Sequence, residues 1–193
     1  MGSGSVGSFT TLCLTKLGFR NITVWDDDFV EEHNIPNQFY RLSDVNDLKV
    51  MALQKLVREF ENVEIRIHAE KYVGQPLNSD VVISAVDSID ARRTIVEAMG
   101  KYNIPFYIDS RMGGELMRIY SLHLAKDGTF PTQYFDTLRE PEEPAPCTAR
   151  SILYNILIIA GMIANLTKKY VMEQPVPYEI IFDLNTLTFI KTE

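Results

Sequence analysis

The spacing of hydrophobic and polar residues changes repeatedly along the chain, between the period of helices and the short apolar runs of strands. Apolar residues recur at helical spacing over 9–17 and 44–60, and the run 22–25 between them predicts a buried strand. Further apolar runs predict strands at 63–67, 80–87, 104–108 and 116–124. This alternation predicts an α/β fold with a Rossmann-like, doubly wound and mainly parallel sheet flanked by helices.

The C-terminal third departs from this alternation. We expect the strand at 116–124 to be antiparallel, and residues 126–147 are rich in Pro, Glu and Thr, which predicts an exposed crossover loop. Residues 151–169 predict an apolar helix, and the pattern over 178–190 predicts a closing hairpin. We therefore expect C-terminal antiparallel strands and a single domain over 1–193.

Each predicted helix has an apolar face that we expect to pack on the sheet. In the helix over 44–60, the inward positions are Val45, Leu48, Ala52, Leu53, Leu56 and Phe60. In the helix over 9–17, they are Phe9, Leu12, Cys13 and Leu17. Cys13 is therefore expected to pack as a small hydrophobic residue. Ser88 is expected to cap a further helix that extends to about Tyr102.

Composition and charge narrow the class of protein. With 193 residues, 46% hydrophobic and 23% charged, the chain has the balance of a globular α/β domain. Its formal net charge of -7 and its pI near 5.0, without a basic stripe, argue against nucleic acid as a partner. The most apolar stretch, 152–166, is short and contains Asn155, which predicts a buried helix and no membrane span.

The cysteine and histidine content argues against a structural zinc site and against a set of disulfide bonds. The two cysteines, Cys13 and Cys147, form no CxxC pair, and the three histidines lack metal-ligand spacing. We therefore expect no structural zinc, and a reducing cytoplasm is the simplest location.

The N-terminal residues Gly2, Gly4 and Gly7 match the pattern G-x-G-x-x-G directly before a predicted helix. Absent side chains let backbone N–H groups approach phosphates, whose negative charge the helix dipole favours. Asp26 lies nineteen residues after Gly7, where a carboxylate on the second strand can bind a ribose hydroxyl. Together these residues predict a nucleotide site. The glycine pattern alone is a weak signal, for which a structural turn is the alternative.

A fold of this kind has a hydrophobic strand immediately before its glycine loop, and this sequence begins at Met1-Gly2. We expect that first strand to be missing through truncation, or its place to be taken by another segment. Otherwise the neighbouring strands would expose unpaired backbone groups.

A series of polar residues follows the glycine loop in a specific order. After Asp26 come Asp28, Val30, Asn34, Gln38, Lys49 and, at the end of a later strand, Asp87. The loop and the series resemble the ThiF/MoeB/HesA superfamily of ubiquitin-activating-type adenylyltransferases. That superfamily shows a glycine loop, D-x-D-x-V, N-x-x-R-Q, a helix-borne lysine and a strand ending in Asp.

The resemblance implies a role for each matched residue. Asp26 would hold the ribose, Lys49 would meet the ATP phosphates, and Asp87 would bind Mg²⁺. The nucleotide site would further include the glycine loop with Asp28, Asn34 and Gln38. Asn37 departs from the family pattern because an arginine usually stands there, and Arg41 is the candidate to replace it.

The activity implied by the resemblance is ATP-dependent adenylation of the C-terminal carboxylate of a ubiquitin-like or sulfur-carrier protein. The carrier would end in a Gly-Gly-type tail, and the enzyme would act as a homodimer or as a heterodimer with a related subunit. In this reaction a carboxylate attacks an anionic phosphate, so the site must supply cations, aligned donors and a metal.

Cys147 is a candidate nucleophile for a later thioester step. It precedes the apolar helix 151–169, and a helix N-terminus favours a thiolate. The stretch from Pro146 to Ser151 is similar to the cysteine region of the activating enzyme for the ubiquitin-fold modifier. A small residue before a helix explains Cys147 almost as well.

Two other functions remain open. A Rossmann oxidoreductase that binds NAD(P) would use the same glycine loop and Asp26, but it gives no reason for the series through Lys49 and Asp87. The chain could also be the non-catalytic scaffold half of an activating-enzyme pair. Asn37 and the expected lack of the first strand suggest this function. Structural roles are also open: a solvated helix charge for Lys49, and turn or loop formation for Asp26, Asp28, Asn34 and Asp87.

Overall fold

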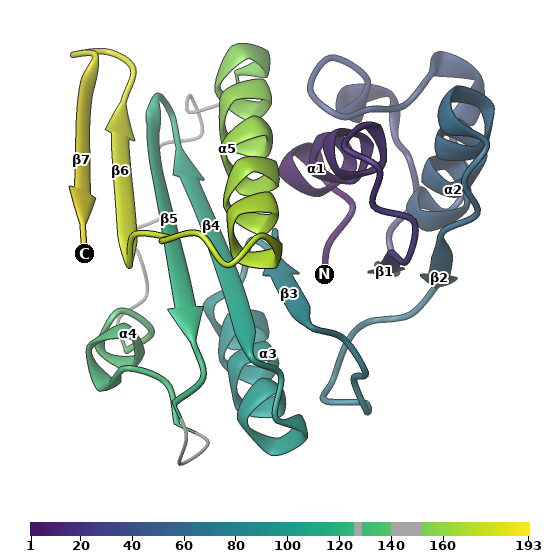
Figure 1. Ribbon diagram of the computed structural model, residues 1–193. Helices are drawn as coiled ribbons and strands as arrows, with labels where there is room; N and C mark the ends of the chain where they lie inside the picture. Colours follow the sequence, from purple (N-terminus) through teal and green to yellow (C-terminus); the bar gives the residue numbers. More distant parts are fainter. Residues whose placement is uncertain (126–128, 140–151) are drawn as a thin grey trace. The chain divides into compact units, whose positions relative to one another are not determined.

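The computed structural model describes residues 1–125, 129–139 and 152–193 of the chain (Figure 1). Its residues divide into two compact units, the first formed by Met1–Tyr72 with Ile152–Ala164 and the second by Val73–Ser151 with Asn165–Glu193. We describe each unit by itself. The expectation of a single domain stays a prediction.

The first unit contains two whole helices, a two-stranded parallel sheet and the N-terminal part of α5 (Leu153–Val171), up to Ala164. Its elements are α1 (Ser5–Lys16), β1 (Thr23–Trp25), α2 (Lys49–Glu61) and β2 (Arg66–His68), with 3-10 turns at Glu32–Asn34 and Leu42–Asp44. The parallel register pairs Thr23 with Arg66 and Trp25 with His68. The core of the unit gathers apolar residues from β1, α2 and the intervening loops, including Val24, Val30, Val50, Leu53 and Ile65.

The buried face of α1 differs from the prediction. The residues buried on this helix are mostly small and polar: Gly7, Ser8, Thr10, Thr11, Leu14 and Thr15. Phe9, Leu12 and Cys13 are only partly buried, and Leu17 is exposed. The apolar-face prediction for this helix is therefore wrong. The reason is that hydroxyls can turn back onto their own helix, as Thr11 and Thr15 do by donating to carbonyls of the preceding turn.

Helix α2 begins later than predicted because a 3-10 turn at Leu42–Asp44 precedes it. The later start shifts the buried face, which includes Val50 and Val57 as well as Ala52, Leu53 and Leu56. Phe60 is exposed, so its assignment to the core is wrong. Its ring instead lies 5.5 Å from that of Phe39.

The second unit contains a five-stranded sheet of order β3-β4-β5-β6-β7. Its strands are β3 (Val81–Ser84), β4 (Phe106–Gly113), β5 (Leu116–His123), β6 (Glu179–Asp183) and β7 (Thr188–Thr192). Only β3 and β4 pair in parallel, and the pairings from β4 to β7 are antiparallel. The antiparallel β5 and the C-terminal hairpin are thereby confirmed, and Figure 1 shows the hairpin in yellow at one edge of the sheet.

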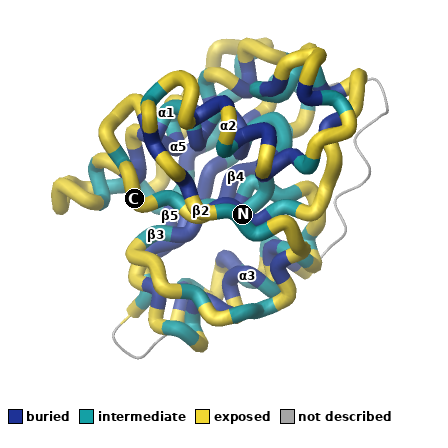
Figure 2. The backbone as a smooth tube through the Cα atoms, turned by 90° about the vertical axis from the view of Figure 1, so that its right-hand side faces the viewer, coloured by how far each residue is buried: buried dark blue, intermediate teal, exposed yellow. Residues whose placement is uncertain are grey.

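Helix α3 (Ile89–Tyr102) connects the parallel pair and begins as predicted, because the Ser88 hydroxyl accepts a hydrogen bond from Ala91 N at 3.2 Å. In Figure 2 this helix carries both buried and exposed stretches. Its buried residues, which include Ile95, Val96 and Met99, also include Arg92. An arginine on the buried face of a helix requires buried acceptors.

Residues 129–139, which lie within the predicted crossover loop, contain regular structure and buried side chains. Within residues 129–139 a short helix, α4 (Thr132–Asp136), forms, and Phe130, Tyr134 and Leu138 are buried. The expectation of an exposed loop is wrong for these residues, because aromatic side chains draw the segment into the core. Helix α5 (Leu153–Val171) confirms the predicted apolar helix. Among the described residues, no helix has the length and hydrophobicity needed to cross a membrane.

Candidate functional site

The glycine loop leads directly into the N-terminus of α1. Gly4 is the N-cap of this helix, and its first turn holds no acidic residue. Gly2 has a φ of 81°, a left-handed conformation that favours glycine. A Cβ placed on Gly4 would meet nothing within 4 Å, and Gly7 is buried in the first turn. No side chain of Gly4 covers the positive end of the α1 dipole, which favours an anion such as a phosphate.

Three hydrogen bonds hold the glycine loop in place. Gly2 N donates to Trp25 O at 2.9 Å, and Ser3 N donates to Asp26 Oδ2 at 2.6 Å. The Tyr40 hydroxyl donates to Ser3 O at 2.6 Å, and burial raises the pKa of Tyr40 far above its usual range. Ser3 and Tyr40 escaped sequence reasoning, since a contact across 37 residues leaves no local pattern.

Asp26 ties the glycine loop to the end of β1. Its Oδ2 accepts from Ser3 N, and its Oδ1 accepts from Asp28 N at 2.9 Å. Each carboxylate oxygen has a second acceptor position, so two N–H donors do not exhaust the group. Asp26 is partly exposed, and it retains the capacity to accept the hydroxyls of a ribose.

Lys49 is the first residue of α2 and is buried, with its side chain only 9% exposed. Its ammonium donates to Asp28 Oδ2 at 2.7 Å, and its backbone N–H donates to Asp28 O at 2.9 Å. The alternative of a solvated helix charge is therefore wrong for Lys49. An ammonium carries three hydrogens, and Asp28 takes one of them, which leaves donors for an anionic ligand.

The carboxylates of Asp26, Asp27 and Asp28 form a compact acidic group, in which one oxygen of each lies within 4.8 Å of the others. Oxygen donors of this kind suit Mg²⁺. The oxygens of Asp26 already accept backbone N–H groups, and Asp28 is the partner of Lys49. The three carboxylates are suitable ligands for a hard cation. Asp26 and Asp28 also have structural roles, because they already accept the hydrogen bonds named above.

The loop between β1 and α2 places the other predicted residues of the first unit. The Asn34 side chain accepts from Glu31 N at 3.0 Å, which is the local loop bond that we gave as its structural alternative. The side-chain oxygens of Asn37 and Gln38 are buried without a hydrogen-bond partner among the described residues. Arg41 is half-exposed and forms an ion pair with Glu59.

Asp87 belongs to the second unit and lies three residues beyond the end of β3. It is exposed, in the turn before α3 that Ser88 caps. The carbonyl of Val86, its neighbour, accepts a hydrogen bond from Arg92. Cys147 lies outside the described residues.

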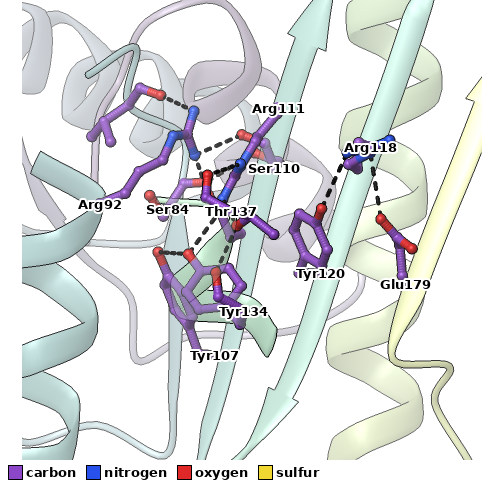
Figure 3. A network of polar contacts seen from close by, with 12 residues as sticks. Ser84, Arg92, Tyr107, Ser110, Arg111, Arg118, Tyr120, Tyr134, Thr137 and Glu179 are labelled. Atoms are coloured by element: carbon purple, nitrogen blue, oxygen red, sulfur yellow. Dashed lines mark hydrogen bonds and ion pairs between the residues drawn. The ribbon is translucent and has the colours of Figure 1, made fainter. Parts of the chain in front are cut away.

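A buried polar network lies behind this turn (Figure 3). The Asp109 carboxylate, which is fully buried within β4, forms ion pairs with Arg92 and Arg111. The strand predicted over 104–108 extends further along the chain, because β4 continues to Gly113. The contributions of Arg111 and Tyr134 were not foreseen.

A glycine loop that enters a helix, followed by an acidic residue at the end of the next strand, is typical of α/β proteins that bind nucleotides. The sequence profile of the ThiF family matches residues 1–192. The chain therefore belongs to the ThiF family.

Several curated proteins are similar in sequence. SUMO-activating enzyme subunit 2 of Dictyostelium discoideum is 26% identical over 159 residues, which cover 78% of this chain and 23% of that protein. Ubiquitin-like modifier-activating enzyme 5 of Drosophila virilis is 28% identical over 128 residues, which cover 55% of this chain and 31% of that protein. The chain thus spans about a quarter to a third of the length of these relatives.

Solved structures show the same fold. A crystal structure of PaaA matches with a TM-score of 0.79 at 19% identity, over 100% of this chain and 70% of that chain. A crystal structure of E. coli MccB with ATP matches with a TM-score of 0.79 at 12% identity, over 100% of this chain and 61% of that chain. The predicted α/β fold, with parallel strands, flanking helices and C-terminal antiparallel strands, is confirmed.

Proposed function

We propose that this chain binds ATP and adenylates the C-terminal carboxylate of a ubiquitin-like protein, a sulfur carrier or a peptide. One observation carries the proposal. A continuous series of hydrogen bonds joins the glycine loop to a buried lysine, from Ser3 N to Asp26, from Asp28 N to Asp26, and from Lys49 to Asp28. An anion-binding helix end, a ribose acceptor and a buried cation thus share one hydrogen-bonded unit.

The residues of this unit suit the chemistry of adenylation. The substrate carboxylate attacks the α-phosphorus of ATP, an acyl adenylate forms, and pyrophosphate leaves. Negative charge builds up on the phosphates during this step, so a preorganised cation and N–H donors lower the barrier. In our proposal Lys49 and the N-terminus of α1 supply these groups, Asp26 holds the ribose, and Asp28, Asn34 and Gln38 complete the nucleotide site.

Asp87 is the proposed ligand for Mg²⁺. Its exposed carboxylate in a capped turn is a hard oxygen donor of the type that magnesium prefers. When bound, the ion would neutralise charge on the phosphates. Arg41 remains the candidate substitute for the arginine of the family, and it would have to leave Glu59 to act.

The partners and later steps are also proposals. Curated relatives are named as a subunit of the SUMO-activating enzyme and as a ubiquitin-like modifier-activating enzyme, and a solved structure of E. coli MccB contains MccA. We propose further that the carrier ends in a Gly-Gly-type tail and that the enzyme acts in the cytoplasm as a homodimer or as a heterodimer with a related subunit. A later thioester on Cys147 is also part of the proposal. Adenylation itself requires no protein nucleophile.

The test is ATP–pyrophosphate exchange by the full chain with a panel of Gly-Gly-tailed ubiquitin-like proteins and short peptides. We expect Lys49→Ala and Asp87→Ala to reduce exchange by about a hundredfold or more, since each removes charge stabilisation in the transition state. The matched controls are Lys55→Ala and Asp80→Ala, which should exchange normally. Lys55 lies at an exposed position of α2, and Asp80 is exposed directly before the first residue of β3.

The same assay separates the alternatives. Equal exchange by Lys49→Ala and Lys55→Ala would refute the role of the buried lysine. If the wild type binds a carrier without pyrophosphate exchange, the scaffold function is favoured. Asn37, which stands where the family usually has an arginine, is the sequence feature that suggests this function. Tighter binding of NAD than of ATP with magnesium would revive the oxidoreductase.

A further inference from the structure

One buried carboxylate in the second unit binds two chain segments at once. On one side of Asp109, Arg92 forms an ion pair with Oδ1, donates to Ser110 O at 3.0 Å and donates to the carbonyl of Val86. Val86 immediately precedes Asp87. Arg92 therefore fastens the turn that carries Asp87 to the middle of β4.

On the other side, Asp109 Oδ2 accepts from Arg111 Nε at 2.8 Å and from the Tyr134 hydroxyl at 3.0 Å. Arg111 also donates to Thr137 O at 3.2 Å and to Thr137 Oγ1 at 2.9 Å. Tyr134 and Thr137 belong to the segment 129–139. This half of the network fastens the segment around α4 to the same carboxylate. Figure 3 labels Arg111, Tyr134 and Thr137, which take part in it.

Two buried guanidinium groups thus share one buried carboxylate. Arg92 is 5% exposed and Arg111 is 9% exposed, whereas Asp109 has no exposed surface. Burial would lower the pKa of Arg111, but the Asp109 carboxylate prevails and holds that pKa above its usual value. Each guanidinium must place its remaining N–H groups on carbonyls, because buried donors without acceptors are costly. A displaced arginine on one side therefore moves the carboxylate that the other side needs.

We propose that Asp109 is a positioning residue that couples the turn of Asp87 to the segment 129–139, so that the two segments hold their conformation together. The proposal rests on the proposed function in one respect, the role of Asp87 as the magnesium ligand. A loosened segment 129–139 would displace the Val86 carbonyl through Arg111, Asp109 and Arg92. The magnesium ligand would then lose its orientation.

The test perturbs one side of Asp109 and observes the other. Arg111→Lys keeps the charge but loses the forked geometry that reaches both Asp109 and Thr137. Backbone hydrogen exchange of the full chain should then accelerate about fivefold or more in residues 85–91 as well as in 129–139. Arg58→Lys is the matched control, because this arginine lies at an exposed position of α2 and pairs with Glu64 at 3.7 Å. Acceleration confined to 129–139 would overturn the coupling.

A second readout concerns magnesium. In ATP–pyrophosphate exchange, Arg111→Lys should raise the Mg²⁺ concentration for half-maximal rate about fivefold or more, without changing ATP binding in the absence of metal. A purely structural role would lower the melting temperature and leave this concentration unchanged. Coupled hydrogen exchange in a protein whose wild type shows no ATP–pyrophosphate exchange would refute the proposed function while the coupling stands.

Should Arg111→Lys fail to fold, Thr137→Val provides a milder perturbation. It removes only the Oγ1 acceptor of Arg111 and the bond from that hydroxyl to Tyr134 O at 2.7 Å. Acceleration of hydrogen exchange in both segments supports the coupling, and acceleration in 129–139 alone contradicts it.

Discussion

At the scale of single residues, the pairing of Lys49 with Asp28 shows how a binding residue is held ready. The lysine is nearly inaccessible, whereas the side chain of Asp28 is 66% exposed. A buried ammonium needs a partner because desolvation penalises its charge. An arriving phosphate would meet a cation that is already desolvated and fixed at the start of α2.

The pairing predicts the effect of Asp28→Asn. This change leaves the buried ammonium beside a neutral amide, so we expect the free energy of unfolding to fall by about 1–3 kcal/mol. Asp27→Asn, at the neighbouring exposed position, should change it by less than about 0.5 kcal/mol. Urea denaturation of the two variants measures the difference. Equal stability of both would show that the ion pair adds nothing in the folded protein.

At the scale of elements, α1 shows how a helix can be buried without an apolar face. The Thr11 hydroxyl donates to Gly7 O at 2.9 Å, and the Thr15 hydroxyl donates to Leu12 O at 2.9 Å and to Thr11 O at 3.1 Å. These two hydroxyls are satisfied within the helix, so they pack as small groups. The glycine loop thus continues into a helix whose buried side chains are short.

This arrangement predicts that volume matters more than polarity at Thr15, which is fully buried. Thr15→Val keeps the shape and loses only bonds to the same helix, so we expect less than about 1 kcal/mol of destabilisation. Thr15→Leu adds volume at a filled position and should cost about 1–3 kcal/mol. Thermal and urea unfolding compare the two. A larger loss for valine than for leucine would mean that the hydroxyl, rather than the space, is limiting.

At the scale of the whole molecule, buried tyrosines set the alkaline limit of stability. Burial raises the pKa values of Tyr40, Tyr107 and Tyr134 above the usual 10.0, with nearby carboxylates adding to the effect. Above pH 10 the unfolded chain releases these protons while the folded chain keeps them. The contribution to stability is therefore complete below pH 10 and is lost as the pH rises beyond it.

We expect the free energy of unfolding to fall above pH 10 by up to about 1.4 kcal/mol per pH unit for each tyrosine. Urea denaturation between pH 8 and pH 11 measures the slope. Tyr134→Phe should reduce the slope because it removes one of the three groups, although it also removes a hydrogen bond to Asp109. A wild-type stability that is constant up to pH 11 would contradict the prediction.

The sequence by itself determined the alternation of elements, the glycine loop before α1, the cap at Ser88, the antiparallel β5 and the family. These features depend on local rules: hydrophobic period, missing side chains at glycine and hydrogen bonds within a few residues. Spacing likewise located Asp26, Lys49 and Asp87, whose chemical roles stay predictions.

Only the tertiary structure decided which side chains these residues meet. The burial of Lys49 against Asp28, the anchoring of the glycine loop by Tyr40 and the sharing of Asp109 by two arginines all join residues far apart in the chain. The polar buried face of α1 and the buried Tyr134 in an expected loop were hidden for the same reason. Burial and pairing energies depend on neighbours that the packing of the chain brings together, and residue order alone does not specify them.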